Sequence, residues 1–320
     1  MAMLDTRIAN GRISREAAGA LASVIFVCLA SVRDVYLGGL FQRLSPLDVA
    51  VIAFGLCTVV CLPIALYKAP DGLHALLRRP ADLFWVNATS AAAWIAFFYA
   101  LRTVEPLLVQ ILFAGIGPVS VVAIDRVLPT ASRSPLHRTE RYVQAGLLVT
   151  LGLAALVAIG GVSGVGAEPV GRAALGVGLA LGAGLSISAN TVICRRLNDD
   201  GVPPIALISV RFVGAVVVAG ALGLYSGTIL PTLVWSRGGA VLAGASLLLI
   251  VFPNYVNQIG IALASPFTVR VVLALAPLVV FVLQWVEGRL PPSPYSLATA
   301  GLYGTLAVAA ALARGQALKT

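Results

Sequence analysis

The amino-acid sequence predicts an all-α membrane protein whose ten transmembrane helices form two inverted five-helix repeats. Three observations indicate this: the composition, the length of the apolar runs and a likeness between the two halves. Of the 320 residues, 59% are hydrophobic and 11% are charged, whereas a soluble domain has about 25% charged residues. The apolar runs are about twenty residues long, enough to cross roughly 30 Å of hydrocarbon as helices. Strands of a membrane β-barrel would be about half that length.

Short loops rich in Pro, Gly and Arg separate ten apolar runs, and each run predicts one membrane-spanning helix. The first run is longer than the roughly 7–15 residues of a signal-peptide core, so we expect it to be retained as a helix. The predicted helices cover residues 17–41, 47–67, 82–101, 106–124, 142–160, 173–194, 204–224, 239–261, 266–286 and 295–313.

The basic residues predict which side of the membrane holds the chain ends. With the N-terminus inside, 14 of the 22 lysines and arginines lie on the cytoplasmic side, five on the outer side and three within spans. Cytoplasmic loops are enriched in Lys and Arg, so we expect cytoplasmic N- and C-termini in a multi-pass protein of the bacterial inner (plasma) membrane. The net charge of +9 is then a topology signal, and no nucleic-acid partner is expected. The expected partners are the lipid bilayer and a small-molecule substrate, and a homodimer is compatible with the pattern.

The second half of the chain repeats features of the first. Residues 100–129 and 262–291 share the order Ala-Leu, Pro, an apolar helix, a second Pro and a close that contains an acidic residue, Arg, Leu and Pro. In a second matched pair of segments, Phe54 stands opposite Phe212. The alternative is that apolar helices look alike through composition alone.

Each half, residues 1–160 and residues 161–320, holds five predicted spans. Because five is odd, the second copy must enter the membrane upside down. Inverted repeats of this kind are typical of secondary transporters, whose binding site lies near the midplane between the repeats.

Two features make the chain similar to a known family. Arg211 and Phe212 lie in the seventh span a few residues after a proline, and helices with the internal prolines Pro118 and Pro277 close on an acidic residue. With ten spans in a five-plus-five order and short loops, the sequence resembles the drug/metabolite transporter superfamily of EamA type. The resemblance implies a substrate exporter, in many cases of amino acids or related metabolites. The first half departs from the family pattern in having Ala53 where the family-type arginine would lie.

Arg33 and Asp34 lie side by side within the first apolar run, and the family pattern does not account for them. A helix from Ala17 to Val32 would have only 16 residues, whereas one that reaches Phe41 has 25 and encloses both charges; spans usually have roughly 17–25 residues. Adjacent helical side chains point about 100° apart, so we expect each charge to have a partner other than its neighbour. Two alternatives stay open: a zwitterionic substrate, with Arg33 on its carboxylate and Asp34 on its ammonium, or polar groups on neighbouring helices. If transport is coupled to protons, Asp34 is the candidate carrier, because burial disfavours its charged form.

Other polar side chains within the spans are candidates for substrate contact. Gln110 and Arg270 each lie four residues after a proline, at matched positions of the two halves, which suggests a shared central lining. The alternative for Arg270 is an anchor at the inner interface. Arg211 could contact substrate, bond to neighbouring helices or extend to the inner surface. The remaining candidates are Trp94, Tyr99, Asn190, Asn254 and Asn257.

The sixth predicted span carries glycines at four-residue spacing. Gly178 and Gly182 would lie on one face of that helix. Small residues at this spacing let two membrane helices approach closely, so we expect a tight helix–helix contact there.

The placement of the titratable residues argues against an enzyme. His74 and His137 fall in predicted loops, Lys68 and Lys319 lie outside the spans, and Asp34 is the one acid well inside a span. No Ser-His pair, zinc site, Ser-Lys site or facing carboxylate pair is therefore available at membrane depth. We expect no catalytic residue, no metal site and no cofactor.

The predicted function is that of a secondary transporter which exports a small polar metabolite, an amino acid or a related zwitterion, by alternating access. The first alternative is an antiporter or exporter of an anionic metabolite, phosphorylated or carboxylate, with Arg33, Arg211 and Arg270 as its basic cluster. The second alternative is a passive channel, against which the inverted repeat argues.

Overall fold

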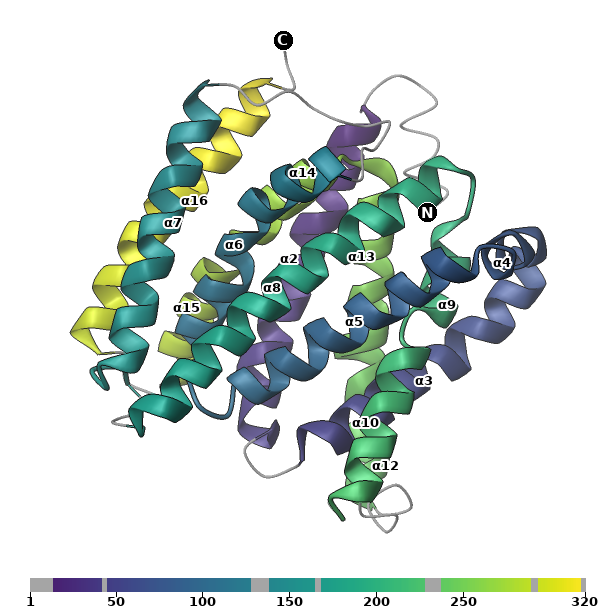
Figure 1. Cartoon of the computed structure of the whole chain (residues 1–320), viewed down its shortest axis with the longest axis horizontal. Coiled ribbons are helices and arrows are strands. Elements are labelled where there is room, and N and C mark those ends of the chain that lie inside the picture. Colours follow the sequence, from purple (N-terminus) through teal and green to yellow (C-terminus); the bar gives the residue numbers. More distant parts are fainter. Residues whose placement is uncertain are drawn as a thin grey trace.

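The computed structural model describes residues 14–41, 45–127, 138–164, 168–227, 237–288 and 293–317, and within these ranges the elements are helices with no strand. Figure 1 shows the helices gathered into one bundle. Ten of the described helical segments are long and apolar enough to cross a membrane, and their bounds agree with the predicted spans to within a few residues. The prediction of an all-α protein with ten spans is therefore confirmed. Several of the basic residues that predicted the topology, such as Arg7, Arg43 and Lys319, lie outside the described residues.

The first six spans are single helices, and three of them, α3, α5 and α6, begin at a proline. Proline is favoured in the first helical turn because it lacks an N–H that would have no partner there. The short helix α4 (Pro70–Leu77) connects the second span to the third. The six helices are α2 (Arg15–Phe41), α3 (Pro46–Lys68), α5 (Pro80–Ala100), α6 (Pro106–Val127), α7 (Arg138–Ile159) and α8 (Val170–Asp199).

The next three spans are interrupted, and prolines explain two of the interruptions. Pro253 follows a π-helical turn, and Pro277 lies four residues after the end of a helix at Leu273. A proline inside a helix removes one hydrogen bond and clashes with the carbonyl four residues earlier. The segments are α9 (Pro204–Val210) and α10 (Val213–Tyr225), then α12 (Arg237–Ser246), η1 (Leu247–Val251) and α13 (Phe252–Leu263), then α14 (Pro266–Leu273) and α15 (Ala276–Glu287), before the tenth span, α16 (Pro294–Ala317).

Side chains from other helices satisfy carbonyl groups at the break between α14 and α15. The Tyr303 hydroxyl donates to the carbonyl oxygen of Ala274 at 2.8 Å, and the Ser31 hydroxyl donates to that of Ala276 at 3.4 Å. Non-helical backbone at membrane depth is tolerated where protein groups satisfy it. The break therefore gives the cavity described below a stable irregular wall.

The helix pairings occur in matched sets. When each span is replaced by the one five places away along the chain, one observed pairing becomes another. α2 packs against α13, α14 and α15, and correspondingly α8 packs against α5 and α6. α3 packs against α9 and α10, and α7 against α16; Figure 1 shows α7 and α16 side by side at one edge of the bundle. Phe54 and Phe212, the matched aromatic residues of the two halves, stack with ring centroids 4.6 Å apart. These pairings fit a repeat of five spans, while the inversion of the second half and the division at residue 160 stay predictions.

The glycine contact on α8 differs from the predicted one by two residues. A Cβ atom at Gly178 or Gly182 would meet no atom within 4 Å, so neither glycine is at a tight contact. A Cβ at Gly176 would lie 2.7 Å from the Val104 side chain, and one at Gly184 would lie 2.5 Å from the Phe113 carbonyl oxygen. The close approach of α8 to its neighbours therefore uses Gly176 and Gly184, and the predicted face was wrong.

Candidate functional site

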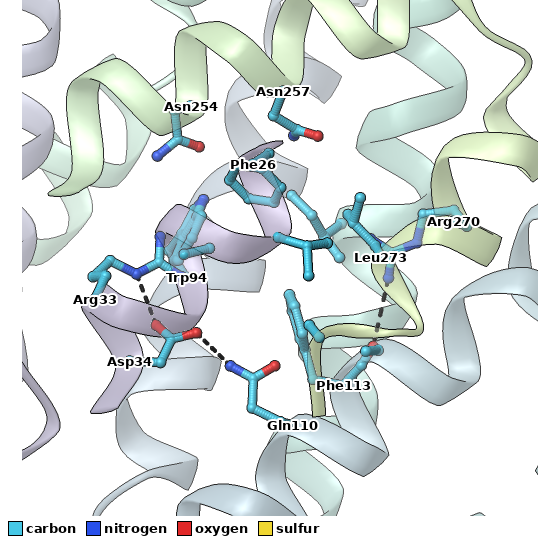
Figure 2. Close-up of a pocket in the computed structure, with 15 residues that line it drawn as sticks. Phe26, Arg33, Asp34, Trp94, Gln110, Phe113, Asn254, Asn257, Arg270 and Leu273 are labelled. Carbon is cyan, nitrogen blue, oxygen red and sulfur yellow. Dashed lines mark hydrogen bonds and ion pairs between the residues drawn. The ribbon is translucent and has the colours of Figure 1, made fainter. Parts of the chain in front are cut away.

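A narrow cavity lies inside the bundle between α2, α5, α6, α8 and the interrupted helices α13 to α15. The cavity has a volume of about 40 Å³. Because one water needs about 10–15 Å³, a few waters or a small ligand group would fit. Much of its wall is apolar, including Phe26, Phe113 and Leu273 (Figure 2). Seven of the ten side chains predicted to contact substrate line it together: Arg33, Asp34, Trp94, Gln110, Asn254, Asn257 and Arg270.

Arg33 and Asp34 are 3% and 4% exposed and pair with each other. Arg33 Nε donates to Asp34 Oδ1 at 2.7 Å, so the expectation that these neighbours would not pair was wrong. The arginine side chain is long enough to bridge the 100° between adjacent helical positions. Gln110 of α6 donates to the other oxygen, Oδ2, at 2.5 Å, and the Arg33 guanidinium lies 4.9 Å from the Trp94 ring centroid. Both charges thus have protein partners on the same and on neighbouring helices, and α2 continues past them to Phe41.

Arg270 is fully buried at the opposite side of the cavity from Arg33 (Figure 2). Its Nη2 donates to the Phe113 carbonyl oxygen at 3.5 Å, the outer limit of a hydrogen bond, and its guanidinium lies 5.8 Å from the Phe113 ring centroid. Its Nε and Nη1 have no hydrogen-bond partner among the described residues. The alternative of an anchor at the inner membrane interface is therefore wrong, because this cation lies inside the protein.

Gly117 of α6 provides the space for that guanidinium. A Cβ atom at position 117 would lie 2.6 Å from Arg270 Nη2, closer than real Cβ contacts come. Gly117 and the cavity-lining Phe113 could not be predicted as site residues, because nothing in the sequence pattern distinguishes them from other residues of an apolar helix.

Amide and indole groups complete the polar lining. Asn254 Nδ2 donates to the Ile250 carbonyl oxygen at 2.8 Å, next to the π-helical turn that precedes Pro253. Asn257 Oδ1 and Trp94 Nε1 are buried without a hydrogen-bond partner among the described residues. The cavity therefore offers unused donors on Arg270, Arg33 (Nη1) and Trp94, and an unused acceptor on Asn257.

Three predicted site residues lie away from the cavity. Asn190 Nδ2 of α8 contacts three oxygens of α5, on Val86, Thr89 and Ser90, at 2.9–3.0 Å, so its role is to join two helices. Tyr99 is half-buried and packs against the largest apolar cluster.

Arg211 is 1% exposed and does not extend to the membrane surface. Its Nη1 donates to Gln258 Oε1 at 2.7 Å, and its guanidinium lies 4.8 Å from the Phe212 ring centroid. Of the two alternatives to substrate contact, bonding between helices is the one observed. The basic cluster expected for a phosphorylated substrate is therefore reduced in the cavity to Arg33 and Arg270.

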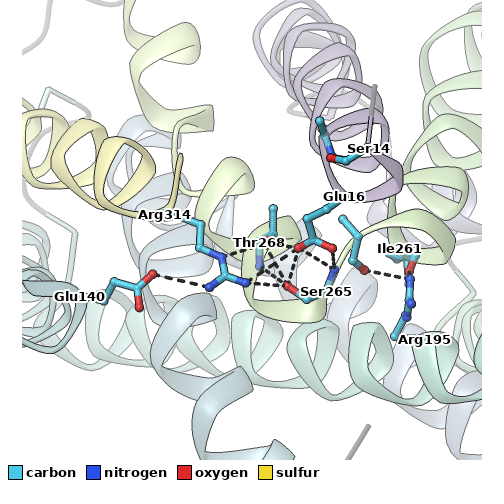
Figure 3. Close-up of polar contacts among 10 residues, drawn as sticks. Ser14, Glu16, Glu140, Arg195, Ile261, Ser265, Thr268 and Arg314 are labelled. Atoms are coloured by element: carbon cyan, nitrogen blue, oxygen red, sulfur yellow. Dashed lines mark hydrogen bonds and ion pairs between the residues drawn. The ribbon is translucent and has the colours of Figure 1, made fainter. Parts of the chain in front are cut away.

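A partly buried cluster of polar side chains, here called the Glu16 cluster, joins four helices at the end of the bundle where α2 begins and α16 ends (Figure 3). Glu16 accepts hydrogen bonds from the Ser265 hydroxyl at 2.8 Å and from the Thr268 hydroxyl at 2.5 Å. Arg314 Nε donates to Thr268 at 2.9 Å, and Arg314 Nη1 lies 3.7 Å from Glu140 Oε1. The first turns of α2, α7 and α14 are thereby tied to the last turn of α16.

A smaller group, the Glu105 cluster, lies at the opposite ends of α7 and α16. Glu105, next to the first residue of α6, accepts from the Ser296 hydroxyl at 2.6 Å and from the Gly164 backbone N–H at 2.9 Å. Glu105 as a whole residue is 2% exposed. Sequence reasoning missed both clusters, because their acids lie at span ends, where charged residues are ordinary.

The described helices form a bundle around a cavity whose largely apolar wall carries buried charged and amide side chains, an arrangement compatible with a membrane transporter. Residues 174–311 match the model of the EamA-like transporter family, and the ten apolar helices fit an EamA-type transporter. The resemblance drawn from the sequence is thus confirmed, and the match indicates a transporter of the drug/metabolite transporter superfamily.

Solved structures agree on the fold. A structure titled "Crystal structure of protein" is similar with a TM-score of 0.67 and 18% sequence identity, over 94% of this chain and 99% of that chain. At this identity the likeness shows the fold alone. A comparison with curated proteins finds no match.

Proposed function

We propose that the protein is a secondary transporter of the bacterial inner membrane which exports a small carboxylate-bearing metabolite by alternating access. The observation that supports this most is the cavity, whose wall carries two buried guanidinium groups and one carboxylate. A zwitterionic amino acid would place its carboxylate on Arg270 and its ammonium near Asp34.

The burial of the charged side chains favours a carrier over a passive channel. Arg33, Asp34 and Arg270 are each at most 4% exposed, whereas charged residues that line a water-filled pore would be accessible to water. The Glu16 and Glu105 clusters lie at opposite ends of α7 and α16. Their alternate opening would give the cavity access to one side at a time.

An anionic carboxylate metabolite is the second candidate, and one observation favours it. Both oxygens of Asp34 already accept hydrogen bonds, from Arg33 and Gln110. The ammonium of a zwitterion would have to share that carboxylate with two existing donors, whereas a carboxylate would meet unused donors.

Transport by the purified protein in liposomes tests the proposal. Uptake of labelled amino acids and of small hydroxy and keto acids is measured with and without an imposed pH gradient, beside protein-free liposomes. We expect saturable uptake of at least one carboxylate compound. Uptake that rises linearly with concentration for every compound would indicate a channel or a leak and would refute the carrier.

The same assay tests whether Asp34 carries a coupled proton. If it does, Asp34→Asn abolishes the stimulation by a pH gradient while exchange of substrate across the membrane continues. Asp48→Asn is the matched control, because Asp48 is also a buried carboxyl but lies outside the cavity. Gradient-driven uptake that survives Asp34→Asn would exclude the proton role.

A further inference from the structure

The formal charges of the side chains that line the cavity do not sum to zero. Arg33, Asp34 and Arg270 are the three charged residues of its described wall. Asp34 is neutralised locally, because one of its oxygens lies 2.7 Å from Arg33 Nε and the other accepts from Gln110. Arg270 has no carboxylate within ion-pair distance among the described residues, so the formal charges of the described cavity wall sum to +1.

The surroundings of Arg270 suit a bound anion. The residue is 0% exposed, and its Nε and Nη1 have no hydrogen-bond partner in the described part of the chain. A charged side chain inside a membrane protein that has no counter-ion is energetically costly and marks a candidate functional position. A carboxylate is the group that a guanidinium binds best, since two of its N–H groups can donate to the two oxygens at once.

The guanidinium is also held in place, as a binding residue requires. It occupies the space left by Gly117, and its Nη2 points to the Phe113 carbonyl oxygen. Figure 2 shows Phe113 and Leu273 between Arg270 and the Arg33–Asp34–Gln110 side of the cavity. These apolar side chains would contact the carbon skeleton of a ligand whose carboxylate lies on Arg270.

We propose that the cavity selects substrates that carry a carboxylate and a net charge of −1, and that Arg270 binds this carboxylate. The proposal rests on the transport function above and narrows its substrate class. A neutral zwitterion would leave the cavity at +1, whereas a monoanion brings it to zero. Two kinds of compound meet this requirement. One is a hydroxy or keto monocarboxylate. The other is an acidic amino acid, whose second carboxylate would meet Arg33 Nη1 and whose ammonium would lie near Asp34.

Isosteric pairs that differ only in this charge test the proposal. The full chain in liposomes is offered labelled L-aspartate and L-asparagine, and separately labelled lactate and lactamide, at neutral pH. We expect the anion of at least one pair to be preferred by about tenfold or more, the scale of a hydrogen-bonded charge contact. The aspartate pair reports an acidic amino acid, and the lactate pair reports a hydroxy acid. Equal uptake within both pairs, or preference for the amides, would overturn the proposal.

Variants of Arg270 assign the preference to this residue. Arg270→Gln should reduce the anion-to-amide ratio to near one, and Arg270→Lys should retain part of it because the charge remains. Arg211→Gln is the matched control, since Arg211 is an equally buried arginine outside the cavity, and it should keep the wild-type ratio. A preference that persists in Arg270→Gln would refute the assignment.

The outcomes separate this proposal from the one on which it rests. Uptake of asparagine or alanine without uptake of the anions would leave the transporter in place and refute the charge selection. Failure to transport any compound of the wider panel would refute both. The comparison within each pair uses the wild-type protein, so the charge selection stays testable even if Arg270→Gln does not fold.

Discussion

At the scale of single residues, Gly117 shows how a side chain that is absent shapes the cavity. The guanidinium of Arg270 occupies the volume that a Cβ at position 117 would need. Replacing Gly117 by any other residue must therefore move Arg270, the cavity cation that has no carboxylate beside it in the described part of the chain. A chemically small change at this position has a large electrostatic consequence.

Gly117→Ala should lower substrate affinity more than it lowers stability. Overpacking of a tight site costs about 1–3 kcal/mol, and the displaced guanidinium would no longer meet the carboxylate. We expect a rise of at least tenfold in the KM of transport with a modest decrease in melting temperature. Gly152→Ala is the control, because a Cβ at position 152 meets no atom within 4 Å. Transport by Gly117→Ala at the wild-type KM would contradict the role given to this contact.

At the scale of elements, the contact between α5 and α8 is the most extensive pairing across the two halves, and Asn190 is its polar centre. The side-chain nitrogen of Asn190 contacts three oxygens of α5. Nearer the start of α8, Gly176 lets the helix approach the segment after α5 closely, and Gly184 lets it approach α6. Hydrogen bonds between helices, together with small residues that let the backbones approach closely, favour helix association in a membrane.

Asn190→Ala should weaken this pairing without changing substrate preference. Removing a buried hydrogen-bonding group costs about 1–3 kcal/mol, so we expect a lower melting temperature of the purified protein. Thr305→Ala serves as the control, because the Thr305 hydroxyl is bonded only within its own helix, to the Leu302 carbonyl. An altered ratio of anion to amide uptake in Asn190→Ala would indicate that Asn190 contributes to substrate binding.

At the scale of the whole molecule, the two polar clusters lie at opposite ends of α16: the Glu16 cluster holds its last turn to α7, and the Glu105 cluster holds its first turn to the segment that follows α7. The Glu16 cluster involves four helices and two carboxylates, whereas the Glu105 cluster involves one carboxylate, a hydroxyl and a backbone N–H. Loss of either cluster should favour the state in which the cavity is accessible from that end.

Cysteine accessibility measures this effect. In a variant in which Cys28, Cys57, Cys61 and Cys194 are replaced, Asn257→Cys places a single thiol in the cavity wall. The extent of its labelling by a membrane-impermeant maleimide measures the accessibility of the cavity. Glu16→Ala should increase labelling several-fold from the side where α2 begins, which the predicted topology places in the cytoplasm. Glu105→Ala should increase it from the other side. Increased labelling from the same side in both variants would contradict opposite gates.

The sequence was sufficient for the spans, because hydropathy and proline positions determine where a chain can cross a bilayer. It also brought most of the cavity residues to attention, because polar groups such as Arg33 and Arg270 stand out within apolar runs. It could not place Arg211 or Asn190, since a buried polar residue looks the same in sequence whether its partner is a ligand or another helix. The glycine face of α8 was shifted for a related reason. Gly176, Ala180 and Gly184 have the same spacing as Gly178 and Gly182, and only the position of the neighbouring helices distinguishes the two faces.

The contact between Arg270 and Gly117 also crosses the boundary between the two halves. Arg270 belongs to α14 in the second half, while Gly117 and the carbonyl group of Phe113 belong to α6 in the first. A rocking motion of one half against the other would carry the cation away from the groups that hold it. The strength with which the protein holds an anion would then change with its own conformation. Release of the cargo and reorientation of the carrier would be two aspects of a single movement.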